Sequence, residues 1–207
     1  MPKTNLAAMF KLFSIALQPI RADWMDLLTE GKLRDDVRMI WTALELPQAP
    51  LDEFCATLDT FVGRDPEEVL HELRQERTRL FIGDKPLVKS SEGLWRRDRE
   101  GRRAVRMINQ YSIEVQEFMR ECGVAKKAGT NDCIDYLETE CDFCAFLADR
   151  PEYLIEMGKE PIDLLDQFMD EHVKKWGPGL CEDVVRETRN PYFRAAYGLM
   201  AEYLKEF

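Results

Sequence analysis

The chain has 207 residues, of which 45% are hydrophobic and 33% charged, and its formal net charge is −10. These proportions are typical of a folded soluble domain, either with one core or with two tightly joined lobes. The acidic balance argues against general binding to nucleic acid or anionic lipid, which requires lysine and arginine, and it favours a basic peptide as partner.

Helix-forming residues dominate the chain, and no run alternates between apolar and polar residues as a half-buried strand would. Pro66 and Pro161 stand where first-turn prolines belong, and Gly63 and Gly123 stand where a helix end favours a left-handed residue. In chain order, we predict helices over 4–17, 22–30, 33–46, 51–62, 66–81, 98–122, 132–149, 161–175, 178–188 and 191–205. The expected fold class is therefore all-α.

We expect one helical bundle domain over residues 1–207, with a hinge at 124–131, where the residues are small and polar. No segment has the roughly 20 consecutive apolar residues that span a bilayer. The apolar run Leu6 to Leu17 is interrupted by Lys11 and is interpreted as an amphipathic first helix, with a secretory signal as the less favoured alternative. A cytoplasmic location is expected.

Enzymatic chemistry has little support in the sequence, and neither catalytic residues nor a cofactor is expected. The chain has two histidines and contains no glycine-rich phosphate loop, no HExxH and no Gly-x-Ser-x-Gly. His172 falls on an apolar stripe with Leu165, Phe168 and Trp176, which favours a structural histidine over a ligand or a base.

Cys141 and Cys144 form a Cys-x-x-Cys pair that would suit a zinc or redox site. The pair lies inside a predicted helix without a second ligand pair, and it continues an apolar stripe with Leu137 and Ala148. Core packing of reduced thiols is the better interpretation, and no metal is expected.

The same predicted helix is strongly acidic. Glu140 projects onto its apolar face, whereas the expected solvated face carries Asp135, Glu138, Asp142 and Asp149. A buried carboxylate has to be paired, protonated or turned towards a cleft. Two alternatives remain open for Glu140: an internal salt bridge or hydrogen bond, or an anion that receives a cationic ligand.

A run of arginines precedes the acidic helix and comprises Arg96, Arg97, Arg99, Arg102, Arg103 and Arg106. Pairing with acidic neighbours or exposure to solvent is the simpler explanation, and a nucleotide or phosphate site is the alternative. Near the start of a helix these cations would oppose the helix dipole, so an anionic group is expected close by.

Three stretches, in order, resemble the TorD/DmsD/NarJ family of redox-enzyme maturation chaperones. The first is similar to the family pattern E-Y-x-R-L-F-x-G-P followed by Y-E-S-x-W. Arg77, Asp84 and Ser91 depart from it, and the matching residues are Arg79, Leu80, Phe81, Gly83, Glu92 and Trp95.

The second stretch is similar to D-H-I-x-x-E-L-E-F-M-A-F-L and matches at Asp135, Glu140, Phe143, Ala145, Phe146 and Leu147, with Tyr136 in place of the family histidine. The third is similar to F-x-x-x-H-x-x-x-W and H-P-F-Y-R-A-L, beginning at Phe168 and Asn190. Together the three stretches cover about residues 69–204.

The resemblance implies an all-helical chaperone that binds the twin-arginine leader of a molybdenum- or tungsten-cofactor oxidoreductase and holds it during cofactor insertion. It implies the apo-enzyme and its signal peptide as partners. The expected hinge between the helical halves favours exchange of helices between copies, so a monomer or a domain-swapped homodimer is expected. The leader-binding residues expected are Asp135, Tyr136, Glu140, Phe143, Arg79, Phe81, Glu92 and Trp95.

Leader binding should weaken with added salt, and burial of Asp135 in a sealed core would count against this assignment. The alternatives are a helical adaptor or regulatory module that binds a folded partner and a nucleotide-dependent switch that uses the arginines.

Overall fold

The structure, a computed structural model, describes residues 3–83, 85–101, 109–125 and 133–206. Within these ranges every regular element is a helix, which confirms the all-α prediction. The helices of the first part are α1 (Lys3–Leu17), α2 (Ala22–Thr29), α3 (Lys32–Ala43), α4 (Gln48–Asp59), α5 (Pro66–Phe81) and α6 (Glu92–Arg99). Those of the second part are α7 (Gln110–Glu121), α8 (Leu137–Asp149), α9 (Pro151–Glu156), α10 (Pro161–Phe168), the π-helical turn η1 (Met169–Val173), α11 (Lys174–Glu187) and α12 (Pro191–Glu206).

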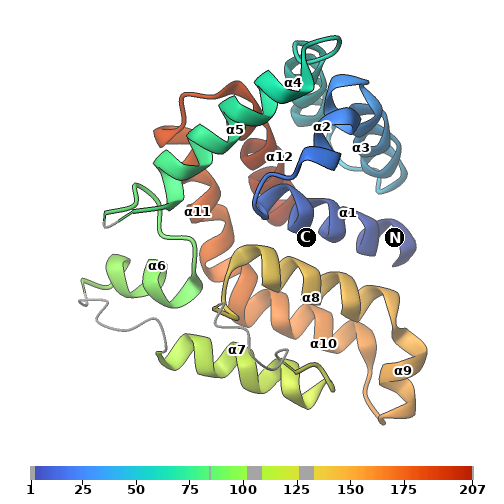
Figure 1. Cartoon of the computed structure of the whole chain (residues 1–207). Helices are drawn as coiled ribbons and strands as arrows, with labels where there is room; N and C mark the ends of the chain where they lie inside the picture. The colour runs from blue at the N-terminus through green and yellow to red at the C-terminus, as the bar shows by residue number, and fades with distance from the viewer. Residues whose placement is uncertain (1–2, 84, 102–108, 126–132, 207) are drawn as a thin grey trace.

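Helices far apart in the sequence lie side by side in the centre of the bundle (Figure 1). The first helix, α1, packs along α8, and α12 packs against α11 and α4. The short helix α6 lies at one side, where it contacts α7 and α11. Consequently the acidic helix α8 is central rather than peripheral.

Two aromatic clusters occupy the core. One joins α1 to α12, where the ring of Tyr203 packs edge-on against Phe10 at 5.4 Å. The other joins α7, α8 and α10 through Phe118, Phe143 and Phe168, with ring centroids 4.8–6.1 Å apart. Burial of these rings supplies a large apolar contribution to stability and holds α7, α8 and α10 against one another.

The predicted helix boundaries are confirmed where capping residues mark them. Asp65 accepts hydrogen bonds from the backbone N–H groups of Glu67 and Glu68, and Pro66 begins α5. Gly63 and Gly123 both have φ of 77°, the left-handed conformation expected at these helix ends.

The single long helix predicted over 98–122 is wrong. Arg99 ends α6, Gly101 follows with φ of 68°, and a reciprocal cap between Asn109 and Ser112 begins α7.

Two further predictions were wrong in the C-terminal part. The helix predicted from 132 begins only at Leu137, because residues before it pair with the segment that precedes α6. The break predicted between 175 and 178 is absent, and Pro178 lies inside α11. Burial of Trp176, Leu180 and Cys181 on one side of α11 outweighs the hydrogen bond that a proline cannot donate.

A separate short helix, α9, was not predicted. Most of the segment proposed as a hinge lies outside the described residues, as do Arg102, Arg103 and Arg106 of the arginine run. In the described part of the chain, none of the helices has the length and apolar character needed to cross a membrane.

Candidate functional site

The start of α6 is joined to the segment just before α8. Ser91 and Tyr136 form an isolated antiparallel bridge, and the backbone N–H of Glu92 donates to the carbonyl oxygen of Asp135 at 2.8 Å. The Asp135 carboxylate accepts a further hydrogen bond from the backbone N–H of Gly93 at 2.9 Å. The Asp135 side chain therefore lies at the N-terminus of α6 and accepts from one of the amide groups that the helix itself leaves unpaired.

Glu92, in the first turn of α6, is completely buried and carries two partners. Its Oε1 accepts from the Arg96 guanidinium at 2.7 Å, and its Oε2 lies 3.0 Å from Nδ1 of His172. His172 is thus a buried structural residue, as predicted, and it belongs to a polar cluster rather than to a purely apolar stripe. Arg96 also lies over the Tyr111 ring, with its guanidinium carbon 4.1 Å from the centroid.

Glu140 is fully buried, as its position on the apolar face predicted. Its Oε2 accepts a hydrogen bond from the Trp176 indole at 2.9 Å, and no described residue bonds to its Oε1. Burial raises the pKa of this carboxyl well above its ordinary value, and the negative charges of Glu92 and Asp135 raise it further. The internal hydrogen bond considered for Glu140 is therefore present, with Trp176 as the donor, and no ion pair to Glu140 occurs among the described residues.

Asp135 resembles Glu140 in having one oxygen without a partner. Its Oδ1 is buried and receives no hydrogen bond from the described residues. Burial raises the pKa of Asp135 as well, against the lowering effect of the Gly93 amide. Glu92, Asp135 and Glu140 thus form a buried acidic cluster, in which Glu92 pairs with the Arg96 guanidinium and contacts the His172 imidazole.

The far end of α6 is held by Asp183 of α11. Asp183 accepts hydrogen bonds from the Trp95 indole at 2.9 Å and from the Arg99 guanidinium at 2.6 Å. Trp95 lies against Gly179, where an added Cβ would come within 2.5 Å of the indole ring. Arg99 in turn lies over the Trp95 ring at 5.0 Å. Arg96 and Arg99 thus each pair with an acidic side chain, and both lie in the last turn of α6, where the helix dipole favours a cation.

The glycine of the Glu92-Gly93-x-Trp95 stretch has a packing role. A Cβ on Gly93 would come within 2.1 Å of the Asn109 side chain, which caps α7. We expect Gly93→Ala to lower the free energy of unfolding by about 1–3 kcal/mol, because α6 and the α7 cap cannot both keep their positions. Urea unfolding at pH 7 measures this, with Gly198→Ala as control, since that position has open space around it. An equal effect of the two substitutions would contradict the packing role.

The aromatic residues proposed for leader contact divide between core and surface. Phe143 is buried between Phe118 and Phe168, so in this conformation it is a core residue. Tyr136 and Trp95 are half-buried. Burial raises the pKa of Tyr136 to about 12, so the phenol remains neutral. Of these three residues, only Tyr136 and Trp95 could contact a peptide without rearrangement.

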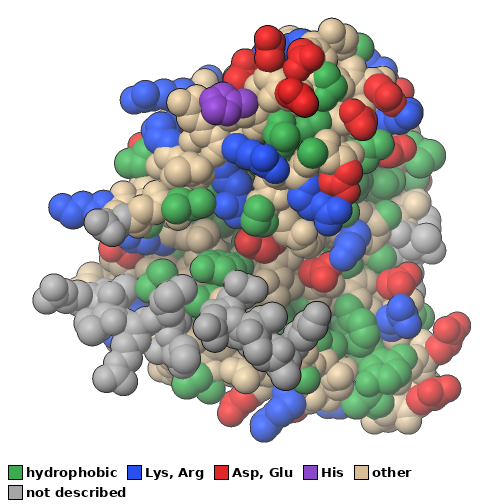
Figure 2. Space-filling model, in the orientation of Figure 1, with side chains coloured by type: hydrophobic (Ala, Val, Ile, Leu, Met, Phe, Trp, Pro, Cys, Tyr) green, Lys and Arg blue, Asp and Glu red, His purple; other side chains and the backbone are tan. Residues whose placement is uncertain are grey.

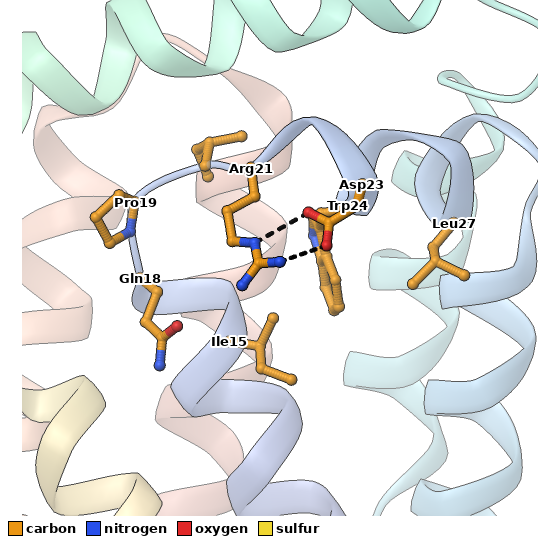
Figure 3. A pocket seen from close by; sticks show the side chains of 8 residues that line it. Ile15, Gln18, Pro19, Arg21, Asp23, Trp24 and Leu27 are labelled. Carbon is orange, nitrogen blue, oxygen red and sulfur yellow. Dashed lines mark hydrogen bonds and ion pairs between the residues drawn. The ribbon is translucent and has the colours of Figure 1, made fainter.

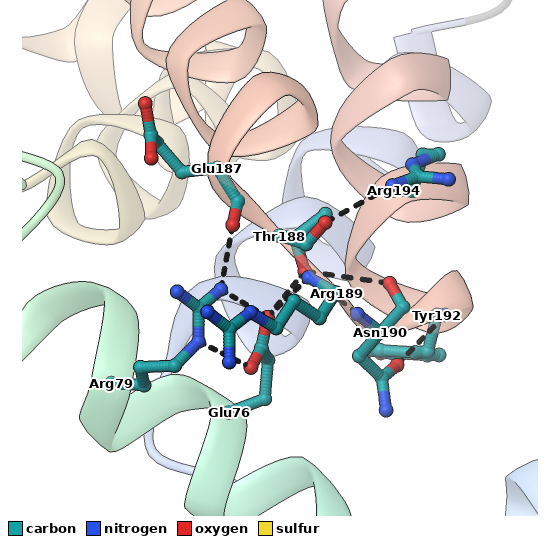
Figure 4. Close-up of polar contacts among 8 residues, drawn as sticks. All are labelled: Glu76, Arg79, Glu187, Thr188, Arg189, Asn190, Tyr192 and Arg194. Atoms are coloured by element: carbon teal, nitrogen blue, oxygen red, sulfur yellow. Dashed lines mark hydrogen bonds and ion pairs between the residues drawn. The ribbon is translucent and has the colours of Figure 1, made fainter.

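Arg79 and Phe81 belong to a different set of contacts at the end of α5. Arg79 binds the Glu76 carboxylate through two nitrogens, each at 2.8 Å, and donates to the Glu187 carbonyl oxygen at 2.6 Å (Figure 4). Phe81 stacks on Tyr197 of α12 at 6.1 Å. The guanidinium of Arg79 thus ties α5 to the end of α11.

The structure therefore brings Glu92, Asp135 and Glu140 together, with Tyr136 next to Asp135, whereas Trp95 contacts Asp183 and Phe143 packs in the phenylalanine cluster. All three carboxylates are buried, and burial of Asp135 is the observation named above as counting against a leader site here. In the conformation described, a peptide cannot contact these carboxylates, so leader binding at this cluster would require α6 to move. Asp135 was expected on the solvated face of α8; it precedes that helix and turns inward to α6. The roles of Asp183, Trp176 and Gly179 were not predicted. The spacing of Glu92 and Arg96 by four residues was a sequence signal for the pairing of those two side chains.

The Glu92–Arg96 ion pair borders a groove on the surface. Arg96 and His172 line a groove of about 460 Å³ between α7 and the η1–α11 segment. Its rim includes Glu114, Glu117, Glu121 and Glu171. A second pocket, of about 290 Å³, lies at the α1–α2 junction beside Trp24, where Arg21 pairs with Asp23 (Figure 3). The acidic groove adjoins the buried cluster, whereas the second pocket is built from the N-terminal helices alone.

The cysteines take no part in this site. Cys141 and Cys144 are free and buried, and burial raises the pKa of both thiols well above the ordinary value, so they remain protonated at neutral pH. No group of three or more metal-binding side chains occurs among the described residues. These findings support the packing interpretation of the Cys-x-x-Cys pair.

Comparison with known proteins agrees with the resemblance seen in the sequence. A family model described as nitrate reductase delta subunit matches residues 45–182, which is more than half of the chain. A search of curated proteins returned no match. The matched range contains α5 to α10 and the whole acidic cluster under α6. The chain belongs to the nitrate reductase delta subunit family, a family of redox-enzyme maturation chaperones rather than catalysts.

Proposed function

We propose that this chaperone binds the twin-arginine leader of a molybdenum- or tungsten-cofactor oxidoreductase in the cytoplasm and holds it while the cofactor is inserted. The observation that carries the proposal is the pair of buried, unpartnered oxygens, Asp135 Oδ1 and Glu140 Oε1. Buried polar atoms without partners are uncommon, and a guanidinium can satisfy two acceptors at once through its planar fork.

The surroundings of these oxygens support an apolar, arginine-bearing peptide. Tyr136 directly follows Asp135, Trp95 lies one helical turn after Glu92, and both side chains are half-buried, so they supply aromatic surface that suits the apolar part of a leader. The net charge of −10 attracts a basic segment over long range. Figure 2 shows charged residues of both signs over one face of the molecule, so this face is not a uniformly acidic surface.

The test is calorimetric titration of the full chain with a synthetic peptide of two adjacent arginines followed by a 15-residue apolar segment. Asp135→Asn keeps an oxygen for the Gly93 amide but removes the charge, and Glu140→Gln keeps an acceptor for Trp176. Asp135→Asn should weaken peptide binding about ten- to a hundredfold, the value of one charge-assisted hydrogen bond. Glu140→Gln should weaken it less, because the raised pKa of Glu140 favours the neutral carboxyl in the free chain.

Two controls make this result specific. A peptide with both arginines replaced by lysine should bind more weakly, because an ammonium cannot form the forked contact. Asp23→Asn, which removes an exposed carboxylate far from the cluster in sequence, should leave affinity unchanged. Binding should also weaken with added salt. Failure of the wild-type chain to bind the peptide would sink the proposal, and a helical adaptor for a folded partner would give that result.

A further inference from the structure

The acidic groove has a negative charge that the residues around it leave largely unbalanced. Its four rim glutamates are Glu114, Glu117, Glu121 and Glu171. Glu114 and Glu171 each accept a hydrogen bond from a neutral glutamine amide, and within the described part of the chain no cation pairs with any of the four. Two cations also line the groove, but Arg96 is bound by Glu92, which leaves Lys175 against four carboxylates.

Three of these glutamates form an acidic stripe along the exposed side of α7. Glu114, Glu117 and Glu121 are spaced three and four residues apart, so their side chains lie one above the other over roughly 10 Å of helix. Like charges at these spacings repel one another and destabilise the helix that carries them. A partner with cations at the same spacing relieves this repulsion, so the acidic stripe favours a basic helix lying beside α7.

A buried histidine borders the same groove. His172 belongs to the π-helical turn η1, a rare conformation that is frequent at functional sites. Its side chain is 5% exposed, and its Nδ1 lies 3.0 Å from the Glu92 carboxylate. Because that carboxylate accepts from Nδ1, the neutral ring keeps Nε2 as an acceptor. Nε2 has no hydrogen-bond partner in the ranges that the structure describes, so it is the ring nitrogen available to a ligand in the groove.

Phe118 adds an aromatic surface to this lining. Its half-buried ring borders the groove and packs edge-on against the His172 ring, with the two centroids 6.3 Å apart. Carboxylate oxygens, an acceptor nitrogen and an aromatic ring together suit a guanidinium or ammonium group, which has hydrogen atoms to donate and a charge that an aromatic face attracts. The chemistry of the groove therefore fits the basic side chains of a protein.

We propose that the acidic groove is a docking surface for a basic helix on a folded partner protein, with one cation beside Phe118 and His172 and others against the acidic stripe. This inference goes beyond leader binding. The groove carboxylates are exposed on α7 and η1 in the conformation described, whereas Asp135 and Glu140 are buried. The partner helix therefore binds without movement of α6 and uses basic residues other than a twin-arginine pair.

The test is calorimetric titration of the full chain with a matched peptide, an alanine-rich helix of about 20 residues that carries arginines at positions i, i+3 and i+7. A control peptide has the same composition with arginines at i, i+5 and i+10, which point to different sides of the helix. The matched peptide should bind about fivefold more tightly than the control peptide, because only its arginines can face the acidic stripe together.

Substitutions in the groove locate the binding site. Glu117→Gln combined with Glu121→Gln should weaken binding of the matched peptide about tenfold, through the loss of two exposed charge pairs. His172→Asn keeps an amide N–H for Glu92 but has no counterpart of Nε2, and it should weaken binding about fivefold. Glu53→Gln, the same chemical change on exposed α4 at the opposite end of the molecule (Figure 1), should change affinity by less than about twofold.

Circular dichroism confirms that each variant is folded, and the double glutamine variant decides the matter if His172→Asn does not fold. Weaker binding by the groove variants, with Glu53→Gln unchanged, supports the docking surface. Equal effects of the groove and Glu53 substitutions, equal binding of the two peptides, or no binding of either peptide overturns it.

Addition of the twin-arginine leader peptide separates the docking surface from the proposed function. Displacement of the matched peptide by the leader peptide would put both in one site and overturn a separate docking surface. Simultaneous binding of the two peptides supports two distinct sites. Failure of the leader peptide to bind, with the matched peptide bound as expected, overturns the proposed function and leaves the docking surface standing.

Discussion

Replacement of Glu76 by alanine is expected to lower the free energy of unfolding by about 3–5 kcal/mol at pH 7, the cost of breaking a buried pair from one side. The Glu76 carboxylate is nearly buried and accepts four hydrogen bonds (Figure 4). Two come from Arg79, one comes from the Thr188 hydroxyl at 2.8 Å, and one comes from the Arg189 amide at 2.7 Å. Its removal leaves the Arg79 guanidinium uncompensated and disconnects α5 from the α11–α12 turn.

The matched control is Glu72→Ala, which removes a more exposed partner of Arg64 from the same helix and should cost at most about 1 kcal/mol. Urea unfolding followed by circular dichroism measures both. Equal costs for the two substitutions would show that the Glu76 contacts do not tie the helices together.

Lowering the pH should weaken the Glu76–Arg79 contact in the wild-type chain and so lower the free energy of unfolding. The bond to Arg79, followed by those to Arg189 and Thr188, lowers the pKa of Glu76 from 4.5 to about 2. A depressed carboxyl pKa stabilises the fold at pH values above 4.5, and that contribution is lost as the pH falls towards 2. It amounts to about 3 kcal/mol, so Glu76→Gln should show a shallower loss of stability in this pH window than the wild type.

Glu140→Gln is expected to make the fold more stable at pH 8 than the wild type, although it alters a buried residue. Burial raises the pKa of Glu140, so the folded chain keeps a proton that the unfolded chain releases above the ordinary glutamate pKa. Wild-type stability therefore falls as the pH rises from about 4.5 towards the raised pKa, by about 1.4 kcal/mol for each pH unit. Glutamine has no proton to release and can still accept from Trp176 through its carbonyl oxygen.

The measurement is urea unfolding of both chains from pH 5 to pH 8. The advantage of the glutamine variant should be small at pH 5 and should grow with pH. Glu114→Gln, the same chemical change on the exposed surface of α7, serves as control. A glutamine variant that is less stable than the wild type at every pH would show that Glu140 is ionised and paired in the fold.

The helical character of the chain and most helix ends could be predicted because they depend on local sequence. Pro66, Asp65, Asn190 and the left-handed glycines act within one turn of their own position. The burial of Glu140 and His172 also followed from helical periodicity alone. Each of these predictions needs only the spacing of residues along one helix.

The predictions that were wrong depend on contacts between distant segments. Asp135 lies before α8 because its backbone and carboxylate bind the start of α6, more than 40 residues away in sequence. The helix continues through Pro178 because core packing of α11 outweighs local preference. Asp183 accepts hydrogen bonds from Trp95 and Arg99, and no sequence motif links it to either residue. Spacing along one helix cannot reveal which residues of another helix face it.

The buried acidic cluster explains how a maturation chaperone could recognise an arginine-bearing segment without a permanently open acidic site. While α6 is in place, the carboxylates of Glu92, Asp135 and Glu140 are shielded from solvent and from unrelated cations. The tyrosine at position 136, where the family pattern has histidine, stays neutral, so the proposed recognition of a leader would depend on the carboxylates rather than on a titrating imidazole.

Hydrogen exchange of the full chain, with and without the arginine-bearing peptide, tests most directly whether the leader binds beneath α6. Saturating peptide should speed exchange of the α6 amides over 92–99, as that helix is displaced, and slow exchange over 135–144. Changes confined to other helices, with exchange over 92–99 and 135–144 unaltered, would contradict a leader site at the acidic cluster.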